Sequence, residues 1–388
     1  DGLVRVANDC LLFLRNLEKI EVLRNGRPIK SVERKGLGGN RIRLIHKPES
    51  TEGDWFVISA DAGDAAEPLR KKYVQIEKLG RQTDLQIAFP LNAKERAPGL
   101  IFAYLPTEQQ SPLPCHINAD FFPEQNRKAL VLSGEQHERY WNEMLLGVAA
   151  EEIAKYLLEL RDVLKPEGLW HLIGEAFQKR DSSHFGVFWD EISSAAIGEP
   201  LVWTTNLQWA EVENCKISPS DVSEKQEKAL AHIGLNMTHR SIRSYQNAQQ
   251  SLGVKRLTLP ALVSALEEWD EILLDDDLQN SQFTFEELLP ALWSITNSFL
   301  AQDALGPDAV HEVVKRLQGV RIAPEEDQSL RTIDELYRLP SPVKNEQIGS
   351  FITELPLTIE DFRKYDRLWA LIDLLTFPEL LRELAEKI

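Results

Sequence analysis

The chain has 388 residues, of which 43% are hydrophobic and 27% are charged; this indicates a folded protein with room for two or three domains and excludes a disordered one. Its net charge of −17 disfavours non-specific nucleic-acid binding, because a phosphate backbone repels so acidic a chain. No stretch approaches the roughly 18 uninterrupted apolar residues of a membrane helix, and the charged, amphipathic start is unlike a signal peptide, so we expect a cytoplasmic protein with no membrane partner.

Residues 16–105 are predicted to form mainly β-strands. Apolar residues alternate on both sides of Asn25-Gly26, a dipeptide that favours a type I′ turn, so this stretch predicts a β-hairpin. Further strands are predicted for the segments NRIRLIH, DWFVISA, TDLQIAFPL and GLIFAYLP. The pattern of residues 69–80 fits either a helix or a strand.

The hydrophobic period changes to that of a helix at residues 135–164, where one long amphipathic helix is predicted. Ser133 is its expected N-cap, and residues 166–168 are expected to end it. Residues 168–181 predict a shorter helix. The segment HFGVFWDEI fits a helix or a strand, and PLVWTTNLQWAEV fits a hairpin or a single strand.

Beyond residue 218 the chain is predicted to be mainly helical. Apolar residues recur at helical spacing in five segments: 220–233, 238–250, 259–274, 283–302 and 307–317. The links GVKRLT and GVRIAP predict single strands between them. Residues 358–377 predict an amphipathic helix, and residues 376–379 supply a capping box and an early proline for a last helix.

Glycine and metal motifs give no sign of a cofactor in this chain. The cluster GLGGN at 36–40 is expected to be a turn, because a phosphate-binding loop needs a strand before it and a helix after it. The eight histidines form no HxH or HxxxH pair. The carboxylates of residues 267–277 lack the spacing of a calcium loop and predict a solvated helix face.

The cysteines do not indicate catalysis either. Cys10, Cys115 and Cys215 lie about a hundred residues apart, too far for a metal motif, and are expected to be reduced thiols. Cys115 and His116 are neighbours in a predicted strand and would point to opposite faces. We therefore expect little catalysis by this chain alone.

Charge is spread unevenly along the chain. Residues 1–50 carry 11 Lys and Arg against 6 Asp and Glu, whereas residues 261–330 carry 15 acidic residues against 3 basic ones. The basic end suits an anion or an acidic partner. Acidic helices suit a basic protein client or a second copy of the chain, so a homo-oligomer is among the expected partners.

The stretch LPCHINADFFPEQNRKALVL, residues 113–132, places a dense polar segment at 124–128 within apolar chain. Two interpretations are open: a turn that leads from a strand into the following helix, or a loop directed at a ligand. Phe121 and Phe122 are expected to anchor it, because each buries a large ring.

The order of motifs around this stretch resembles sacsin-type repeats and related bacterial proteins with an Hsp90-like (GHKL) ATPase. The family pattern has a strand ending in Leu-Pro, a second Leu-Pro strand with His and Asn, an Asn-Arg pair, and Trp-Asn-Glu opening a long helix. Its counterparts in this chain are Leu105-Pro106, Leu113-Pro114 with His116 and Asn118, Asn126-Arg127, and Trp141-Asn142-Glu143. The resemblance spans nearly the whole chain and is most specific at residues 97–160.

The resemblance implies an α+β fold: an Hsp90-middle-like α/β domain, of the ribosomal protein S5 domain 2-like type, followed by mainly helical modules. Residues 1–27 would be the exit segment from an ATPase domain, 28–165 the α/β domain, 166–217 a small α/β linker module and 218–388 the helical C-terminal module. The family's nucleotide-binding Glu/Asn box and Asp-x-Gly-x-Gly turn do not occur here. ATP and Mg²⁺ are therefore expected only in the full-length protein, and Asp1 is not expected to be its natural start.

The resemblance also implies a catalytic side chain. In Hsp90-like proteins the domain after the nucleotide site reaches back with a basic residue to the γ-phosphate, where a cation stabilises the charge on the transferring phosphoryl oxygens. By position in the pattern this residue is Arg127, with Lys128 the second candidate. Asn118 and Asn126 are expected to support the loop through hydrogen bonds to the backbone.

By this resemblance, the chain is the middle and C-terminal part of a sacsin-like ATPase that couples ATP-driven conformational change to protein clients or partners, as a chaperone or in bacterial anti-phage defence. The full-length protein is expected to be an ATPase and this chain alone is not. A non-enzymatic interaction scaffold and a nucleic-acid-associated effector subunit are the alternatives. An Asp-x-Gly-x-Gly domain encoded upstream would separate the ATPase from the scaffold, and the net charge disfavours the effector.

Overall fold

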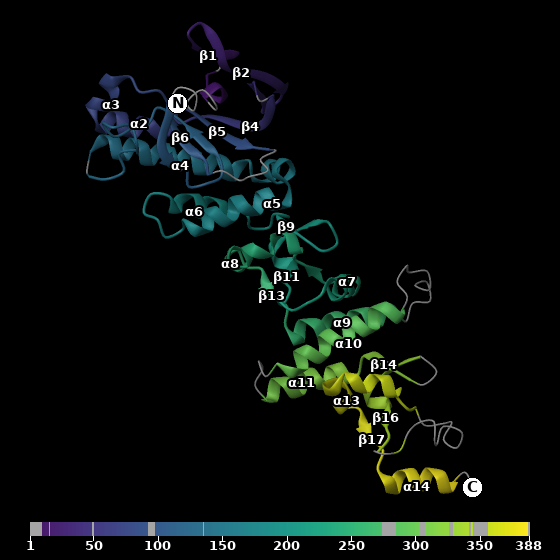
Figure 1. Ribbon diagram of the computed structural model, residues 1–388. Coiled ribbons are helices and arrows are strands. Elements are labelled where there is room, and N and C mark those ends of the chain that lie inside the picture. The colour runs from purple at the N-terminus through teal and green to yellow at the C-terminus, as the bar shows by residue number, and fades with distance from the viewer. Residues whose placement is uncertain are drawn as a thin grey trace. The chain divides into compact units, whose positions relative to one another are not determined.

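The computed structural model shows an α+β protein with two compact units (Figure 1). It describes residues 10–14, 16–48, 50–91, 98–134, 136–273, 285–302, 307–325, 329–340, 343 and 356–386. Unit 1 ends at Val202 but takes up residues 241–253 again, and unit 2 consists of residues 203–240 and the chain from Val254 onward. The first nine residues of the expected exit segment lie outside the described part, and the finer module boundaries stay predictions.

Unit 1 is built on an eight-stranded sheet in the order β1-β2-β3-β4-β5-β8-β6-β7. Its strands are β1 Lys19–Arg24, β2 Arg27–Gly38, β3 Arg41–Lys47, β4 Thr51–Asp61, β5 Asp84–Pro90, β6 Leu100–Ala103, β7 Leu105–Gln110 and β8 His116–Asn118. Strands β6 and β8 pair in parallel, and the other neighbours pair antiparallel. Asn25 (φ 53°) and Gly26 (φ 75°) turn the chain between β1 and β2, which confirms the predicted hairpin.

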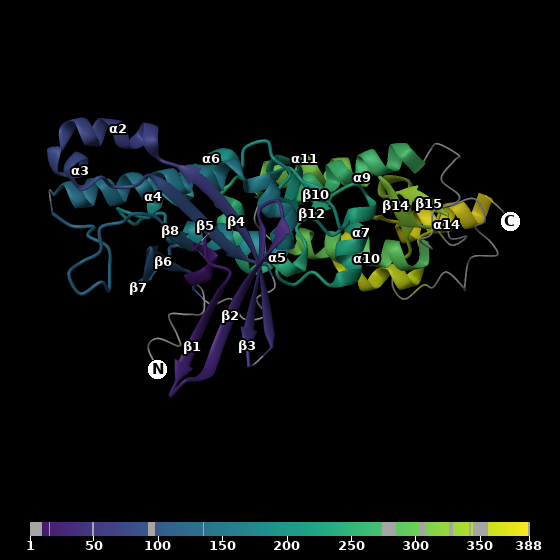
Figure 2. The same ribbon diagram turned by 90° about the horizontal axis from the view of Figure 1, so that it is seen from above.

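Unit 1 also contains helices, some of which pack against the sheet while others pack against those helices. They are the 3-10 turn Cys10–Leu12, α2 Gly63–Lys72, α3 Val74–Leu79, α4 His137–Lys155, α5 Leu157–Gln178, α6 Gly186–Ala195 and α8 Gln246–Ser251. Helix α4 contacts β4, β5, α2 and α6, and strands β1 to β3 extend beyond the helices (Figure 2). The ambiguous segment 69–80 is helical, because it falls in α2 and α3.

The N-terminal turn packs against the sheet rather than leading away from it. Leu11 and Leu12 are fully buried, and they form one hydrophobic cluster with Val32, Leu44 and Phe102 from three strands. Burial of apolar side chains on the sheet therefore fixes this turn in unit 1.

The single long helix predicted at residues 135–164 is wrong. Helix α4 begins at His137 after Gln136, so Ser133 is not its N-cap, and the helix breaks at Tyr156 before α5. Inside α5 the backbone leaves helical geometry at Lys165 (φ 62°), directly before Pro166. A residue that precedes proline disfavours the helical region, which explains the kink at the predicted end.

Unit 2 is mainly helical, as predicted beyond residue 218, with short strand pairs between its helices. Its helices are α7 Glu224–His232, α9 Leu259–Leu273, α10 Phe285–Ala301, α11 Pro307–Gln318, α13 Asp366–Leu371 and α14 Phe377–Glu386. It also has 3-10 turns at Val212–Asn214, Ile333–Glu335 and Glu360–Lys364. A further 3-10 turn, Arg240–Tyr245, lies at the boundary with unit 1. Its strands are β9 Val202–Trp203, which begins at the last residue of unit 1, β10 Trp209–Ala210, β11 Cys215–Ile217, β12 Asn236–Met237, β13 Lys255–Arg256, β14 Arg321–Pro324, β15 Leu330–Thr332, β16 Tyr337–Arg338 and β17 Asp373–Leu374. Trp293 lies in the core, where its indole N–H donates to the Ile322 carbonyl at 2.6 Å.

Two predictions for unit 2 are corrected by tertiary contacts. Residues 358–377 do not form one helix, because β17 within them pairs with β16 and ends the helical segment at Leu371. The carboxylates at 267–277 are not simply solvated, since Glu267 pairs with Arg316 and Asp270 with Arg321. Residues 274–277 of that stretch lie outside the described part.

The start of α7 allows a test of local stability. Ser223 Oγ accepts from Gln226 N at 3.4 Å, and Gln226 Oε1 accepts from Ser223 N at 2.8 Å, so the two residues form a capping box. Ser223→Ala is expected to lower the free energy of unfolding by about 1 kcal/mol in urea denaturation followed by circular dichroism. Exposed Ser220→Ala is the control, with an expected change within about 0.5 kcal/mol. Equal unfolding midpoints for the two variants would contradict the role of the cap.

Candidate functional site

The carboxyl ends of β6 and β8 lie side by side at one edge of the unit 1 sheet. The two strands are parallel, with Ile101 beside Ile117 and Phe102 beside Asn118. Loops that leave the carboxyl ends of parallel strands are a common position for ligand-binding residues. The polar segment 124–128 belongs to the loop that follows β8.

The polar segment is a closed loop. Pro123 and Leu130 pair across its base in an isolated β-bridge, and Arg127 N donates to the Glu124 carbonyl at 2.8 Å. Helix α4 begins only at His137, ten residues after Arg127. The segment is therefore a closed turn of its own between β8 and α4, and both interpretations of it stay predictions.

Two consecutive residues of α4 fix the chain that leads into and out of this loop. Asn142 is fully buried; its Oδ1 accepts from Phe122 N at 2.8 Å, and its Nδ2 donates to the Phe122 carbonyl at 2.8 Å and the Val131 carbonyl at 3.0 Å. The indole N–H of Trp141 donates to the Asp120 carbonyl at 2.9 Å. The loop is thus fastened to a helix on both sides.

Sequence reasoning did not assign this supporting role to Trp141 and Asn142. Asn142 could have been found from the sequence, because it is an amide within an apolar helix face and a buried amide requires hydrogen-bond partners. The expected anchors Phe121 and Phe122 are both buried, which confirms that prediction.

Arg127 and Lys128 both lie exposed on the loop. Arg127 Nη2 donates to the Ala103 carbonyl, at the end of β6, at 3.3 Å. A guanidinium has five N–H donors, so this bond leaves most of them for a ligand. Lys128 Nζ lies 3.2 Å from Glu108 Oε2, but both side chains are more than half exposed, so this ion pair stabilises the loop little.

The two asparagines accept backbone hydrogen bonds at this edge. Asn118 Oδ1 accepts from Tyr104 N at 3.0 Å, and Asn126 Oδ1 accepts from Lys128 N at 2.8 Å. Asn126 therefore shapes the loop itself, and Asn118 fixes the turn between β6 and β7. The contact of Asn126 matches the expected supporting role, whereas that of Asn118 lies outside the loop, and the catalytic roles of Arg127 and Lys128 stay predictions.

Tyr104 is a further residue of this edge that sequence reasoning missed. It has a left-handed backbone (φ 61°), as Arg127 has (φ 56°), and Arg127 contacts the residue just before it. Left-handed non-glycine residues cost about 1–2 kcal/mol each and gather at functional sites. Burial raises the pKa of Tyr104, and the Asp120 and Asp84 carboxylates raise it further, so its phenol remains a hydrogen-bond donor at neutral pH.

Arg81 is the third cation nearby, but its charge is already matched. Its guanidinium pairs with the Asp120 carboxylate and lies 3.8 Å from the centre of the Phe122 ring. Gln82 N donates to the other Asp120 oxygen at 2.9 Å. Arg81 therefore organises the site, and Arg127 is better placed to meet a ligand.

The arrangement suits an anion. Within the described residues, no group of three or more His, Cys, Asp or Glu side chains could hold a metal ion. Burial raises the pKa of the Cys115 thiol to about 12, so it stays protonated and is a poor nucleophile. The guanidinium of Arg127 and the ammonium of Lys128 lie on the same loop and can each donate to phosphoryl or carboxylate oxygens.

Comparison of the chain with protein-family models, curated proteins and solved structures finds no match. Among the described helices, none is both long enough and apolar enough to cross a membrane. The family and activity are therefore inferred from the motifs and the geometry of the site.

Proposed function

We propose that this chain is the middle and C-terminal part of a sacsin-like, Hsp90-type ATPase, which couples ATP-driven conformational change to protein clients or partners. Arg127 carries the proposal: an exposed guanidinium on a loop fixed by α4, at the carboxyl edge of β6 and β8. In this proposal Arg127 reaches the γ-phosphate held by an ATPase domain upstream in the full-length protein, with Lys128 as the second cation.

The fixed loop makes Arg127 suited to this role. Because Asn142 and Trp141 already order the chain on both sides, presenting Arg127 costs little conformational entropy at the moment of reaction. Arginine stays charged and donates in a planar fork that matches phosphate oxygens. A cation fixed where charge develops stabilises the transition state more than the ground state.

The architecture supports the same proposal at a coarser level. Unit 1 combines a mixed sheet with covering helices, which is compatible with an Hsp90-middle-like α/β domain, and unit 2 supplies the mainly helical modules. We propose that unit 2 contacts protein clients or partners, because residues 261–330 carry 15 acidic residues against 3 basic ones.

The chain alone is expected not to bind ATP appreciably, because it lacks the family's nucleotide-binding motifs. Calorimetric titration of the 388-residue chain with Mg-ATP should give no saturable heat, whereas the protein extended by its upstream ATPase domain should bind. Micromolar binding by the chain alone would overturn this division of roles. Failure of the extended protein to bind or turn over ATP would favour the scaffold instead.

A further inference from the structure

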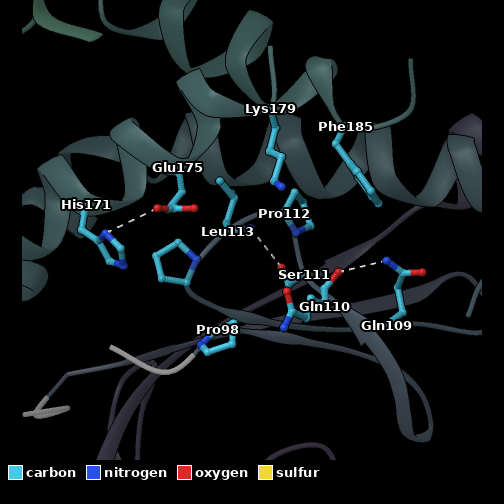
Figure 3. A pocket seen from close by; sticks show the side chains of 11 residues that line it. Pro98, Gln109, Gln110, Ser111, Pro112, Leu113, His171, Glu175, Lys179 and Phe185 are labelled. Carbon is cyan, nitrogen blue, oxygen red and sulfur yellow. Dashed lines mark hydrogen bonds and ion pairs between the residues drawn. The ribbon is translucent and has the colours of Figure 1, made fainter. Parts of the chain in front are cut away.

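A second candidate site lies in unit 1, between the segment after β7 and one face of α5. It is a half-open pocket of about 300 Å³, at the lower end of the volumes that small ligands occupy (Figure 3). The residues that line it are Pro98, Gln109, Gln110, Ser111, Pro112, Leu113, Pro114, His171, Glu175, Lys179 and Phe185. None of them belongs to the loop of Arg127.

One wall of the pocket is rigid and largely apolar. Pro112 and Leu113 are buried, and prolines at positions 112 and 114 restrict the backbone. Gly99 lies in the neighbouring segment of the same chain. A Cβ at this position would overlap the backbone carbonyls of Leu113 and Cys115. The close approach of these two segments holds the wall in place. Phe185 adds a ring on the opposite side (Figure 3).

The other wall carries three titratable side chains at helical spacing. His171 and Glu175 lie four residues apart on α5, and Lys179 follows four residues later as the C-cap of this helix. Glu175 and Lys179 have the order that favours an ion pair along a helix. Instead, Glu175 Oε1 lies 4.0 Å from His171 Nδ1 and 3.4 Å from Gln178 Nε2.

Because Glu175 contacts these two neighbours, the ammonium group of Lys179 is available to a ligand in the pocket. No carboxylate in the described part of the chain lies within ion-pair distance of its ammonium group, and Figure 3 shows its side chain extending toward Pro112 while Glu175 turns toward His171. An ammonium group above an apolar wall, with amide side chains from Gln109 and Gln110 at the rim, matches an apolar ligand with one carboxylate.

We propose that this pocket holds the C-terminal residue of a peptide, with its carboxylate at Lys179 and its apolar side chain against Phe185 and the proline-rich wall. Gln109 and Gln110, which also line the pocket, would contact the last peptide group, and Gln109 Nε2 would exchange its present 3.3 Å hydrogen bond to the Gln110 carbonyl for one to the peptide. The proposal does not depend on the ATPase assignment. The structural alternative is that Lys179 only stabilises the C-terminal end of α5, where a cation interacts favourably with the helix dipole.

The test uses two probes that differ only in charge: N-acetyl-L-phenylalanine and its amide. Titration of the whole chain, followed by NMR shifts of backbone amides near Lys179 and Phe185, is expected to show the acid binding roughly five- to tenfold tighter than the amide. Lys179→Gln should abolish this preference, and Lys155→Gln, which removes the same charge from an exposed side chain at the end of α4, should keep it. High salt should reduce the preference.

Equal binding of acid and amide, or a preference that survives Lys179→Gln, would overturn the proposal. A Lys179→Gln variant that is less stable but retains the preference would support the helix-end alternative. 3-Phenylpropionate, which lacks the peptide group, tests the source of the carboxylate. Weaker binding than N-acetyl-L-phenylalanine supports a peptide end, and equal binding would overturn that assignment in favour of a free small acid.

Discussion

Arg127→Ala, in the chain joined to the upstream ATPase domain that we propose, is expected to lower ATP turnover about 10- to 1000-fold, the range for losing one transition-state contact. Removing the guanidinium loses one hydrogen bond to the Ala103 carbonyl, while the backbone and Asn126 maintain the shape of the loop. ATP affinity should change much less, because the contact forms mainly in the transition state. Steady-state ATPase rates and a nucleotide titration on the same protein measure both quantities.

The left-handed backbone at Arg127 provides a matched control. Arg127→Gly removes the same guanidinium but relieves the backbone strain at φ 56°, so it should lower turnover as alanine does while leaving stability equal or up to about 1 kcal/mol higher. Lys128→Ala removes a neighbouring charge from an exposed ion pair and is expected to have a smaller effect. An unchanged rate in both Arg127 variants would remove Arg127 from the site.

Asn142→Leu is expected to lower the free energy of unfolding by about 3 kcal/mol or more. The substitution keeps the approximate size of the side chain but leaves the Phe122 N–H and the Val131 carbonyl without the Asn142 partner they have now, while the Phe122 carbonyl keeps the hydrogen bond from Val131 N at 3.1 Å. Each buried polar group that loses its partner costs about 1–3 kcal/mol, although some reach water after a local rearrangement. Urea denaturation, with tryptophan fluorescence as the signal, measures the change.

Asn126→Ala is the control for Asn142→Leu, because Asn126 is exposed and makes one local hydrogen bond to Lys128 N. Its expected loss of stability is about 1 kcal/mol or less. If Asn142→Leu were no more destabilising than Asn126→Ala, the loop would not depend on α4 for its position. The argument that Arg127 is presented on an ordered loop would then fail as well.

Local chemistry explains which parts of the fold could be predicted. The Asn25-Gly26 hairpin and the capping box at Thr376 and Glu379 are encoded within a few residues, and both occur in the structure. The break at Tyr156 and the strand β17 depend on packing and pairing with distant chain. Hydrophobic periodicity alone continues through such breaks, so it predicted helices that were too long.

The same distinction applies to the candidate site. The polar loop and its buried phenylalanines could be located from the sequence, because a turn-rich segment stood between apolar ones. The pairing of Arg81 with Asp120 spans 39 positions, and the fastening of Phe122 by Asn142 spans 20. No local pattern encodes those distances. The left-handed backbone of Tyr104 could not be predicted from the sequence either, since neither Tyr104 nor the residues next to it are glycine.

The interleaved division of the chain has a consequence for synthesis. Unit 1 takes up residues 241–253 after unit 2 has begun, and within unit 1 the backbone of Gly174 lies so close to Tyr245 that an added Cβ would sit 2.5 Å from the ring. A ribosome that has made the whole sheet, which ends at Asn118, must therefore add residues 119–240 before it starts the last piece of unit 1. A stop codon just after Val202 would release a protein that contains every strand of the large sheet but lacks α8 beside α5. Such fragments should be recognised by chaperones and proteases as unfinished, and neither unit can be cloned out of this chain with a single cut.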